Sequence, residues 1–240
     1  MTVPYRDSDE NKKRQVEQMF DRIAPKYDFL NHFLSLGIDK LWRKKAINIL
    51  KKHCPETLLD MATGTGDFAI AALKIKPKRI VGFDISDQML NIGRQKVERL
   101  GLGDVIHFEK GDSENMPFTE QSFDAITSAF GVRNFENIEK GLSEFLRVLK
   151  PGGVAVILEF SKPEMFPFKQ IYKFYFFYIL PFVGGIVSKD ASAYNYLPDS
   201  VMSFPDGQDF LNILSKVGFV DPKQRRLTFG IATIYEAVKL

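Results

Sequence analysis

The chain has 240 residues, of which 45% are hydrophobic and 26% are charged, and its net charge is +3. These values are typical of a globular protein. They exclude a disordered polymer, a fibre and a disulfide-stapled scaffold, and so small a net charge does not indicate nucleic-acid binding. One cysteine, Cys54, cannot form an internal disulfide, and the polar residues after Met1 are unlike a signal peptide, so we expect a reducing, cytoplasmic location.

The N-terminal segment predicts helices and carries the basic excess. Apolar residues at helical spacing predict one helix at 11–22, followed by a short helix at 27–36 and a third at 39–53. Residues 1–54 hold 12 Lys and Arg against 7 Asp and Glu, a balance of +5. Such a charge excess is usually a solvated helix face; the alternative is attraction to an anionic membrane. We expect this segment to form a helical cap on the substrate side.

Strands alternate with helices in the rest of the chain, 55–240, which we expect to form a single domain together with the helical cap. Strands are predicted at 57–61, 79–83, 105–109, 123–129 and 154–160, and helices at 68–73, 87–100 and 138–149. Ser86 is the expected N-cap of the second helix, and Pro151 with the two glycines after it forms the expected turn into the fifth strand. A helix at 207–217 and strands at 219–227 and 231–238 complete the pattern. This order predicts an α/β fold with a mostly parallel sheet, an antiparallel closing strand and helices on both faces.

Aromatic residues are concentrated in one segment. Nine of them fall within the 17 residues from Phe166 to Phe182. The uncharged part, between Lys173 and Lys189, is shorter than the roughly 20 apolar residues of a membrane span. The composition favours a buried core helix. The alternative is a pocket or surface that binds an apolar ligand.

A glycine-rich turn follows the first predicted strand. Gly64, Gly66 and Ala69 make a G-x-G-x-x-A pattern, in which the backbone can approach a ligand closely. The pattern also fits a dinucleotide fingerprint or a plain tight turn. Asp60 and Asp67 flank it, and two carboxylates would repel a pyrophosphate but suit a cation. S-adenosylmethionine (SAM) brings an ammonium and a sulfonium and no phosphate.

Further acids stand at the ends of the next two strands. Asp84, 18 residues beyond Gly66, can accept hydrogen bonds from both ribose hydroxyls. Asp112, followed by Ser113, can accept one from an adenine amino group. Acids at three consecutive strand ends predict SAM binding by a class I, Rossmann-like methyltransferase fold.

Several motifs resemble those of the UbiE/COQ5 quinone C-methyltransferases. The resemblance covers nearly the whole chain and rests on Y-D-x-x-N-x-x-x-S-x-G-I-x-x-L-W (27–42), LDMATGTGD (59–67), FGVRN (130–134), RVLKPGG (147–153), LEFSKP (158–163) and SAYNYLPDS (192–200). It implies methylation of a ring carbon of a prenylated hydroquinone by SAM: demethylmenaquinol, or alternatively 2-methoxy-6-polyprenyl-1,4-benzoquinol. The expected cofactor-binding residues are Asp60, Thr63, Gly64, Gly66, Asp67, Asp84, Asp112, Ser113 and Ala129.

Arg133, Asn134 and Tyr27 are the candidate catalytic residues. Arg133 is too basic to act as a base, so we expect it to stabilise the ring oxyanion while Asn134 orients it. The alternative for Arg133 is a salt bridge to Glu159. Tyr27, like Tyr194 and Tyr196, is a candidate for the pocket wall or a proton relay. No metal is expected, because the methyl of SAM is already activated.

A prenylated substrate changes the expectation for the aromatic segment and the basic segment. Residues 162–205 become the candidate substrate-binding insertion that receives the isoprenoid tail, and 1–54 a candidate contact with the inner face of the membrane. A homodimer stays open. Two other classes also stay open: a dinucleotide-dependent oxidoreductase and a non-enzymatic SAM-binding protein.

Overall fold

The computed structural model describes residues 2–179 and 191–240. The described strands form one sheet in the order β3-β2-β1-β4-β5-β7-β6, in which β7 runs in the direction opposite to the other strands. The strands are β1 (Thr57–Met61), β2 (Arg79–Asp84), β3 (Ile106–Lys110), β4 (Phe123–Ala129), β5 (Leu149–Phe160), β6 (Val220–Leu227) and β7 (Ala232–Val238). This confirms the predicted class I, Rossmann-like sheet with an antiparallel closing strand.

Helices cover both faces of the sheet because neighbouring residues of its central strands point to opposite sides. Leu59 of β1 faces one core with α5 and α9, whereas Leu58 faces the other with α2 and α3. The helices of these layers are α2 (Ile38–Leu50), α3 (Asp67–Ala72), α4 (Asp87–Arg99), α5 (Ile138–Val148) and α9 (Gln208–Val217), with short 3₁₀ turns η1 (Leu73–Ile75), η2 (Val132–Asn134) and η4 (Thr228–Gly230). Ser86 caps α4 as predicted, since its Oγ accepts from the Met89 amide at 3.2 Å.

The N-terminal prediction of two helices before α2 was wrong. A single helix, α1 (Lys12–Leu34), runs through Pro25. Proline removes one intrahelical hydrogen bond, but the apolar face continues on both sides of it. Met19, Ile23 and Leu30 are buried in one cluster with residues of α4 and α8. Burial of that continuous face keeps the helix intact.

The predicted turn before the fifth strand was also wrong. β5 begins at Leu149 and includes Pro151 and the two glycines. Its pairing with β4 shifts register there, so the extra residues form a bulge. Gly152 lies in this bulge at φ +77°, a conformation that suits glycine.

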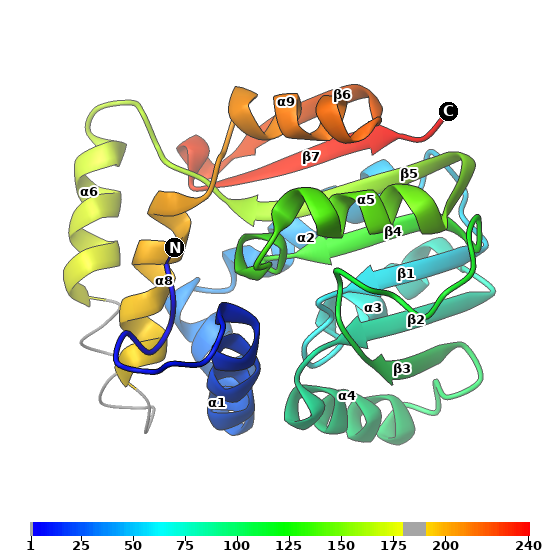
Figure 1. Ribbon diagram of the computed structural model, residues 1–240, viewed down its shortest axis with the longest axis horizontal. Helices are drawn as coiled ribbons and strands as arrows, with labels where there is room; N and C mark the ends of the chain where they lie inside the picture. The colour runs from blue at the N-terminus through cyan, green and yellow to red at the C-terminus, as the bar shows by residue number, and fades with distance from the viewer. Residues whose placement is uncertain (1, 180–190) are drawn as a thin grey trace.

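A group of helices lies beyond the carboxyl ends of the parallel strands. In Figure 1 the strand arrowheads point toward α1, α6 (Phe168–Phe174) and α8 (Ala191–Ser203), while the C-terminus lies on the opposite side. α6 continues as a π-helical turn, η3 (Tyr175–Ile179), and Phe182 of the aromatic segment lies outside the described residues. Within the described part of the chain, no helix is both long and apolar enough to cross a membrane.

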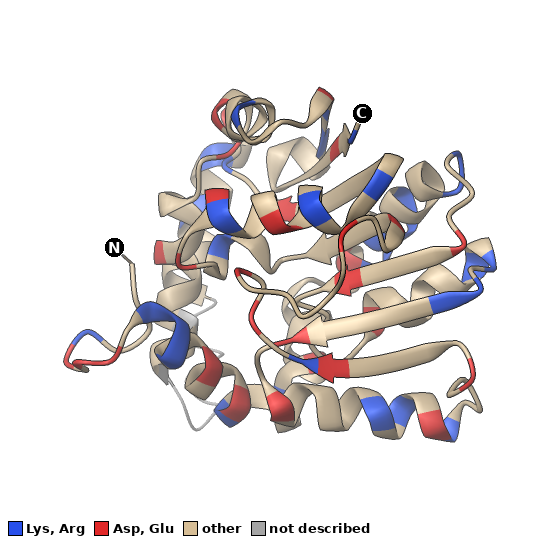
Figure 2. Cartoon of the chain, turned by 45° about the vertical axis from the view of Figure 1, so that its right-hand side comes forward, with Lys and Arg blue, Asp and Glu red and all other residues tan. Residues whose placement is uncertain are grey.

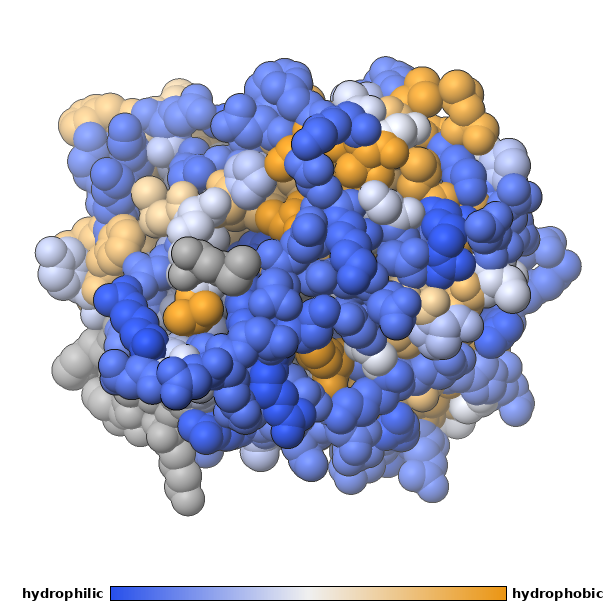
Figure 3. Space-filling model, in the orientation of Figure 1, coloured by the Kyte–Doolittle hydropathy of each residue, from blue (hydrophilic) through white to orange (hydrophobic). Residues whose placement is uncertain are grey.

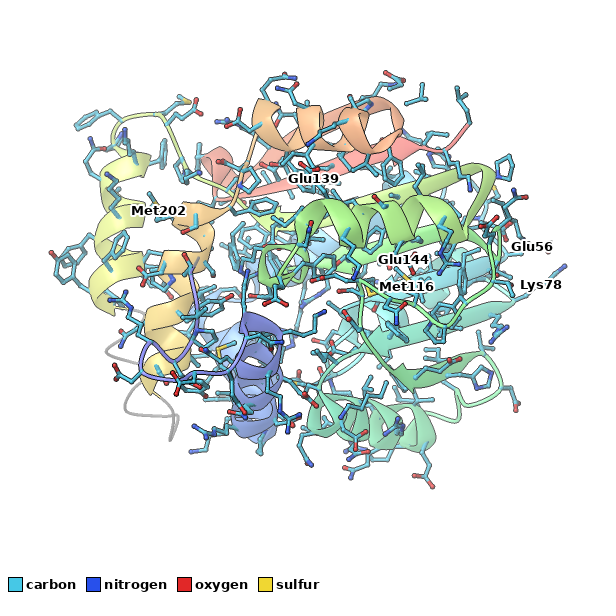
Figure 4. The ribbon with its side chains drawn as sticks, viewed as in Figure 1. Glu56, Lys78, Met116, Glu139, Glu144 and Met202 are labelled. Atoms are coloured by element: carbon cyan, nitrogen blue, oxygen red, sulfur yellow. The ribbon has the colours of Figure 1, made fainter. Side chains whose placement is uncertain are left out.

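Ion pairs at the amino ends of the strands lie far from this helical group. Figure 4 shows Glu56 and Lys78 together at that edge, where their side chains are 2.8 Å apart. The same view places Glu144 of α5 beside Met116, and the Glu144 carboxylate accepts a hydrogen bond from the Met116 amide at 2.8 Å. These contacts hold loops in place at and beside the sheet. The polar groups that line cavities lie instead at the carboxyl ends of the strands.

Candidate functional site

A cavity of about 70 Å³ opens at the carboxyl ends of the strands, and we call it the strand-end cavity. Figure 2 shows acidic residues at several of the arrowheads there. The cavity lies where the strand order reverses between β1 and β4, the place at which open α/β sheets bind ligands. Five of the nine predicted cofactor residues line it: Gly64, Asp84, Asp112, Ser113 and Ala129.

The glycine turn after β1 is built by two different constraints. Gly64 has φ +56°, lines the cavity and donates its amide to Asp84 Oδ2 at 2.8 Å. Gly66 has φ +81°, and a Cβ there would lie 2.6 Å from the ring of Phe108. Gly66 therefore allows the turn to pack on the sheet, and it does not line the strand-end cavity.

Two buried carboxylates fix the turn. Asp84 also accepts the Ser86 amide at 2.9 Å, and Asp60 accepts the hydroxyls of Thr63 at 2.6 Å and Thr127 at 2.7 Å. Burial raises the pKa of both Asp60 and Asp84 to about 6, although these hydrogen bonds act in the opposite direction. Both carboxylates are therefore mostly anionic at neutral pH, although the pH is then only a little above their pKa.

Asp67 and Asp112 are paired with lysines. Asp67 lies 2.8 Å from Lys96 and lines a small side cavity together with Asp60 and Thr63. Asp112 lies 2.6 Å from Lys13, so α1 closes over the outer end of the strand-end cavity. Lys96 also lies 2.5 Å from Asp28, so it offsets the negative charge of Asp67 only in part.

A second cavity, of about 290 Å³, lies between the sheet edge and helices α1, α2, α6 and α8, and we call it the helical cavity. Its lining is mostly apolar and aromatic, with Trp42, Phe160 and Phe176 among the large side chains. Phe20, Tyr27, Phe130 and Asn134 line both cavities. The two cavities therefore share a wall.

Arg133 and Asn134 follow β4 in the turn η2, as predicted. Arg133 forms the salt bridge that the sequence left as an alternative: its Nη1 lies 2.8 Å from Glu159 Oε1, and both side chains are buried. Its Nε has no hydrogen-bond partner among the described residues, and neither has Asn134 Oδ1. The pairing with Glu159 thus leaves one donor of Arg133 unused in a residue that lines the helical cavity.

Tyr27 projects from α1 to the shared wall. Desolvation raises the pKa of its phenol above the ordinary value, so the hydroxyl keeps its proton at neutral pH. Lys12, at the start of the same helix, donates to the Phe135 carbonyl at 2.7 Å and to the Arg133 carbonyl at 3.2 Å. Burial lowers the pKa of Lys12 to about 8. This contact ties α1 to the turn that carries Arg133.

Sequence reasoning missed Lys12, Phe130 and Tyr172 as parts of this region. Tyr172 lies inside the aromatic segment, but nothing in the spacing showed that it, and not its neighbours, faces the cavity. Tyr196 lines the helical cavity as proposed, whereas the side chain of Tyr194 lies outside what the structure describes. No cluster of three or more potential metal ligands occurs in the described ranges.

The comparisons with known proteins agree on one family. The model of the ubiE/COQ5 methyltransferase family matches residues 7–239. The chain is 53% identical to a demethylmenaquinone methyltransferase from Bacteroides fragilis, over 98% of this chain and 96% of that protein. It is 47% identical to the ubiquinone/menaquinone biosynthesis C-methyltransferase UbiE of Geotalea daltonii, over 95% of this chain and 97% of that protein.

The fold is also shared with more distant proteins. A SAM-dependent methyltransferase from Thermotoga maritima superposes with a TM-score of 0.65 at 20% identity, covering 93% of this chain and 99% of that one. That likeness shows the fold, and the match across nearly the whole sequence shows the family. The chain belongs to the ubiE/COQ5 methyltransferase family and is a methyltransferase.

Proposed function

We propose that this protein transfers a methyl group from SAM to a ring carbon of demethylmenaquinol, giving menaquinol. The relatives named above support this substrate. The observation that carries the proposal is the wall shared by the two cavities, formed by Phe20, Tyr27, Phe130 and Asn134. The two cavities adjoin at these residues, so a polar methyl donor in one and an apolar acceptor in the other would come together there. Methyl transfer needs this arrangement.

The strand-end residues fit the methyl donor. Asp84 supplies a buried carboxylate for the ribose hydroxyls, and Asp112 and Ser113 lie where the adenine would be held. Gly64 lets the backbone approach, and Asp60, with Thr63, holds the turn. Ala129 lines the same cavity and Asp67 the side cavity, whereas Gly66 acts on the proposed site through the packing of the turn. When bound, SAM supplies an electrophilic methyl group, so the proposed reaction calls for no metal.

On the acceptor side, the chain must make the ring electron-rich. The free Nε of Arg133 can donate to the oxygen beside the accepting carbon, which stabilises the phenolate form of that oxygen. Glu159 holds the guanidinium in place through its salt bridge. Asn134 orients the same oxygen from the shared wall. When the ring carbon takes the methyl group, S-adenosylhomocysteine leaves and the hydrogen of that carbon is lost as a proton, which restores the aromatic ring. Tyr27, which keeps its phenol proton, is a candidate relay that accepts a proton from the substrate while it donates its own.

The helical cavity fits the isoprenoid tail. It is bounded by α1 and α2, from residues 1–54, and by α6 and α8, from residues 162–205, so we propose that these two segments together form the acceptor side. Phe176 is 3% exposed and lines the cavity, whereas Phe177 is 42% exposed and does not. The tail contact proposed for the aromatic segment is therefore made by Phe176 and not by Phe177.

We propose that the outer face of α6 contacts the membrane that holds the quinol. Ile171 and Phe174 are about 60% exposed there (60% and 61%), next to the exposed Lys169 and Lys173. Figure 3 shows hydrophobic residues at the left edge of the molecule, where Figure 1 has α6. Exposed apolar residues beside lysines favour an anionic bilayer surface. Sedimentation with anionic vesicles should capture the protein, and Phe174→Glu with Ile171→Glu should abolish capture; retained capture contradicts the contact.

Methyl transfer from labelled SAM to reduced demethylmenaquinone tests the function directly. We expect label in menaquinol, and no label in any prenylated hydroquinone would contradict the proposal. The second candidate acceptor is 2-methoxy-6-polyprenyl-1,4-benzoquinol, which the name of the UbiE relative favours. Parallel assays with both acceptors rank them, and equilibrium binding should detect SAM but not NAD.

A further inference from the structure

Polar atoms without partners gather in the helical cavity. Six buried side-chain nitrogen and oxygen atoms have no hydrogen-bond partner among the described residues, and five of them belong to residues that line this cavity. A buried polar atom without a partner costs about 1–3 kcal/mol. Native structures therefore hold few of them, and such a concentration in one cavity points to a ligand with polar groups. The five residues are Arg43, Arg133, Asn134, Tyr172 and Tyr196.

Two of these atoms are phenol oxygens of tyrosines that line the cavity from separate helices. Tyr172 of α6 is 7% exposed and Tyr196 of α8 is 4% exposed, and neither hydroxyl is paired within the described ranges. Tyr175, which lines the same cavity, differs: its hydroxyl donates to the Leu34 carbonyl at 2.6 Å. A tyrosine hydroxyl in this cavity can therefore find a partner within the protein, as that of Tyr175 does, but the hydroxyls of Tyr172 and Tyr196 have none among the described residues.

Both unpaired phenols remain hydrogen-bond donors at neutral pH. Burial raises the pKa of Tyr196 to about 12 and that of Tyr172 further, while the charge of Arg133 acts on both in the opposite direction. The ring of Tyr172 stacks on Phe176 with centroids 4.5 Å apart, which holds its orientation. Two O–H groups in an apolar wall suit an oxygen atom of the ligand, whereas an isoprenoid chain offers none.

We propose that Tyr172 and Tyr196 together bind the second oxygen of the hydroquinone, the one beside the prenylated carbon. This inference rests on the proposed function. Asn134 lines both cavities and so lies near the accepting carbon and its neighbouring oxygen, while neither tyrosine lines the strand-end cavity. Because the two oxygens of a 1,4-hydroquinone lie on opposite sides of the ring, binding both fixes which carbon faces the methyl donor. The tyrosines are positioning residues, and they select 1,4-diols over monophenols.

Binding of two ligands that differ by one hydroxyl tests this assignment. The ligands are 2-prenyl-1,4-dihydroxynaphthalene, kept reduced, and 3-prenyl-1-naphthol, which lacks only the oxygen beside the prenylated carbon. Equilibrium binding is measured with S-adenosylhomocysteine present, so the readout does not depend on methyl transfer. We expect Tyr172→Phe and Tyr196→Phe each to weaken diol binding about tenfold and to change naphthol binding less than twofold.

Tyr175→Phe is the matched control, because it removes a hydroxyl from the same wall whose partner is protein. We expect it to affect both ligands equally and to lower the melting temperature. Tyr172→Phe and Tyr196→Phe should leave the melting temperature unchanged or higher, since they remove unpaired buried hydroxyls. Equal losses on both ligands, no loss on the diol, or no binding of either ligand to the wild type would overturn the assignment. Selective diol binding without methyl transfer would instead refute the proposed function and leave the assignment standing.

Discussion

The strand-end cavity and the helical cavity differ in how their polar atoms are paired. In the first, both oxygens of Asp84 accept hydrogen bonds from the protein itself, and both oxygens of Asp60, in the side cavity next to it, do the same. In the second, the hydroxyls of Tyr172 and Tyr196 have no partner in the described part of the chain. The sheet thus fixes the donor side, whereas the acceptor side presents groups that a ligand would pair. We expect changes in the first cavity to alter SAM affinity and changes in the second to alter acceptor use.

Replacing Arg133 should give the largest effect, a loss of turnover on the acceptor side without a matching loss of SAM affinity on the donor side. Arg133→Ala alone would leave Glu159 as an unpaired buried charge, which typically costs 3–5 kcal/mol of stability. Combined with Glu159→Gln, it should lower kcat by about 10²–10³ because an oxyanion donor is lost, with SAM affinity changed less than threefold. Steady-state turnover and calorimetric SAM binding measure the two quantities. Glu159→Gln alone is the control, and a parallel loss of SAM affinity would break the division.

Asp84→Asn probes the other side. The amide removes the charge and one acceptor oxygen, so we expect SAM affinity to fall about tenfold by calorimetry. Acceptor binding should stay within twofold. Asp124→Asn is a matched control at the amino ends of the strands, where Lys150 and Thr57 hold the pKa of Asp124 at about 2. That variant should lose stability without losing SAM affinity; equal affinity losses in the two variants would refute the ribose contact.

Phe176→Asp should sharpen the assignment of the tail. A carboxylate in the apolar wall opposes burial of an isoprenoid chain, in which each CH₂ contributes about 0.8 kcal/mol. We expect the ratio of kcat/KM for a long-chain acceptor to that for a tail-less one to fall at least about tenfold. Phe177→Asp, on the outer side, should leave the ratio unchanged. A ratio constant in both variants would mean that the tail lies elsewhere.

The smallest effect is a pH dependence of SAM affinity. Asp60 and Asp84 lose their charge as the pH falls through about 6, so affinity should be a few-fold lower at about pH 5 than at about pH 7. Stability moves the other way. Because the pKa of both groups is raised on folding, their contribution to stability is full below the unfolded value of 3.8 and is lost as the pH rises through about 6. Titrations of binding and of thermal unfolding should diverge, and Asp84→Asn should flatten the binding curve; curves that move together would contradict these pKa values.

Much of the donor side could be predicted because strand-end position is a local property. The end of a buried strand places Asp84 at the carboxyl edge whatever the helices do, and Gly64 follows from the turn. Asp67 shows the limit of this reasoning. Its charge was counted as free, but Lys96, 29 residues further along the chain, pairs with it. Sequence spacing does not show which distant cation reaches a carboxylate.

The acceptor side could be predicted as a region but not residue by residue. The aromatic segment was visible in the composition, yet which of its rings face inward depends on how α6 packs against α1 and α8. Tyr172 and Phe176, four residues apart, share the inner face, and Phe177 next to them faces outward. The long α1 shows the same dependence, since its tertiary contacts keep it continuous across Pro25.

The sequence by itself determined the sheet of a class I methyltransferase, the family motifs and the acids at the strand ends, because alternation and turn chemistry are local. Only the tertiary structure decided that Arg133 pairs with Glu159 yet keeps Nε free, and that Tyr172 and Tyr196 converge unpaired on one cavity. The first depends on β5 lying beside β4 in the sheet, and the second on helices α6 and α8 packing around one cavity. The amphipathic pattern of each helix predicts that it is buried, but the partner and the rotation that decide its inner residues arise only when the helices assemble.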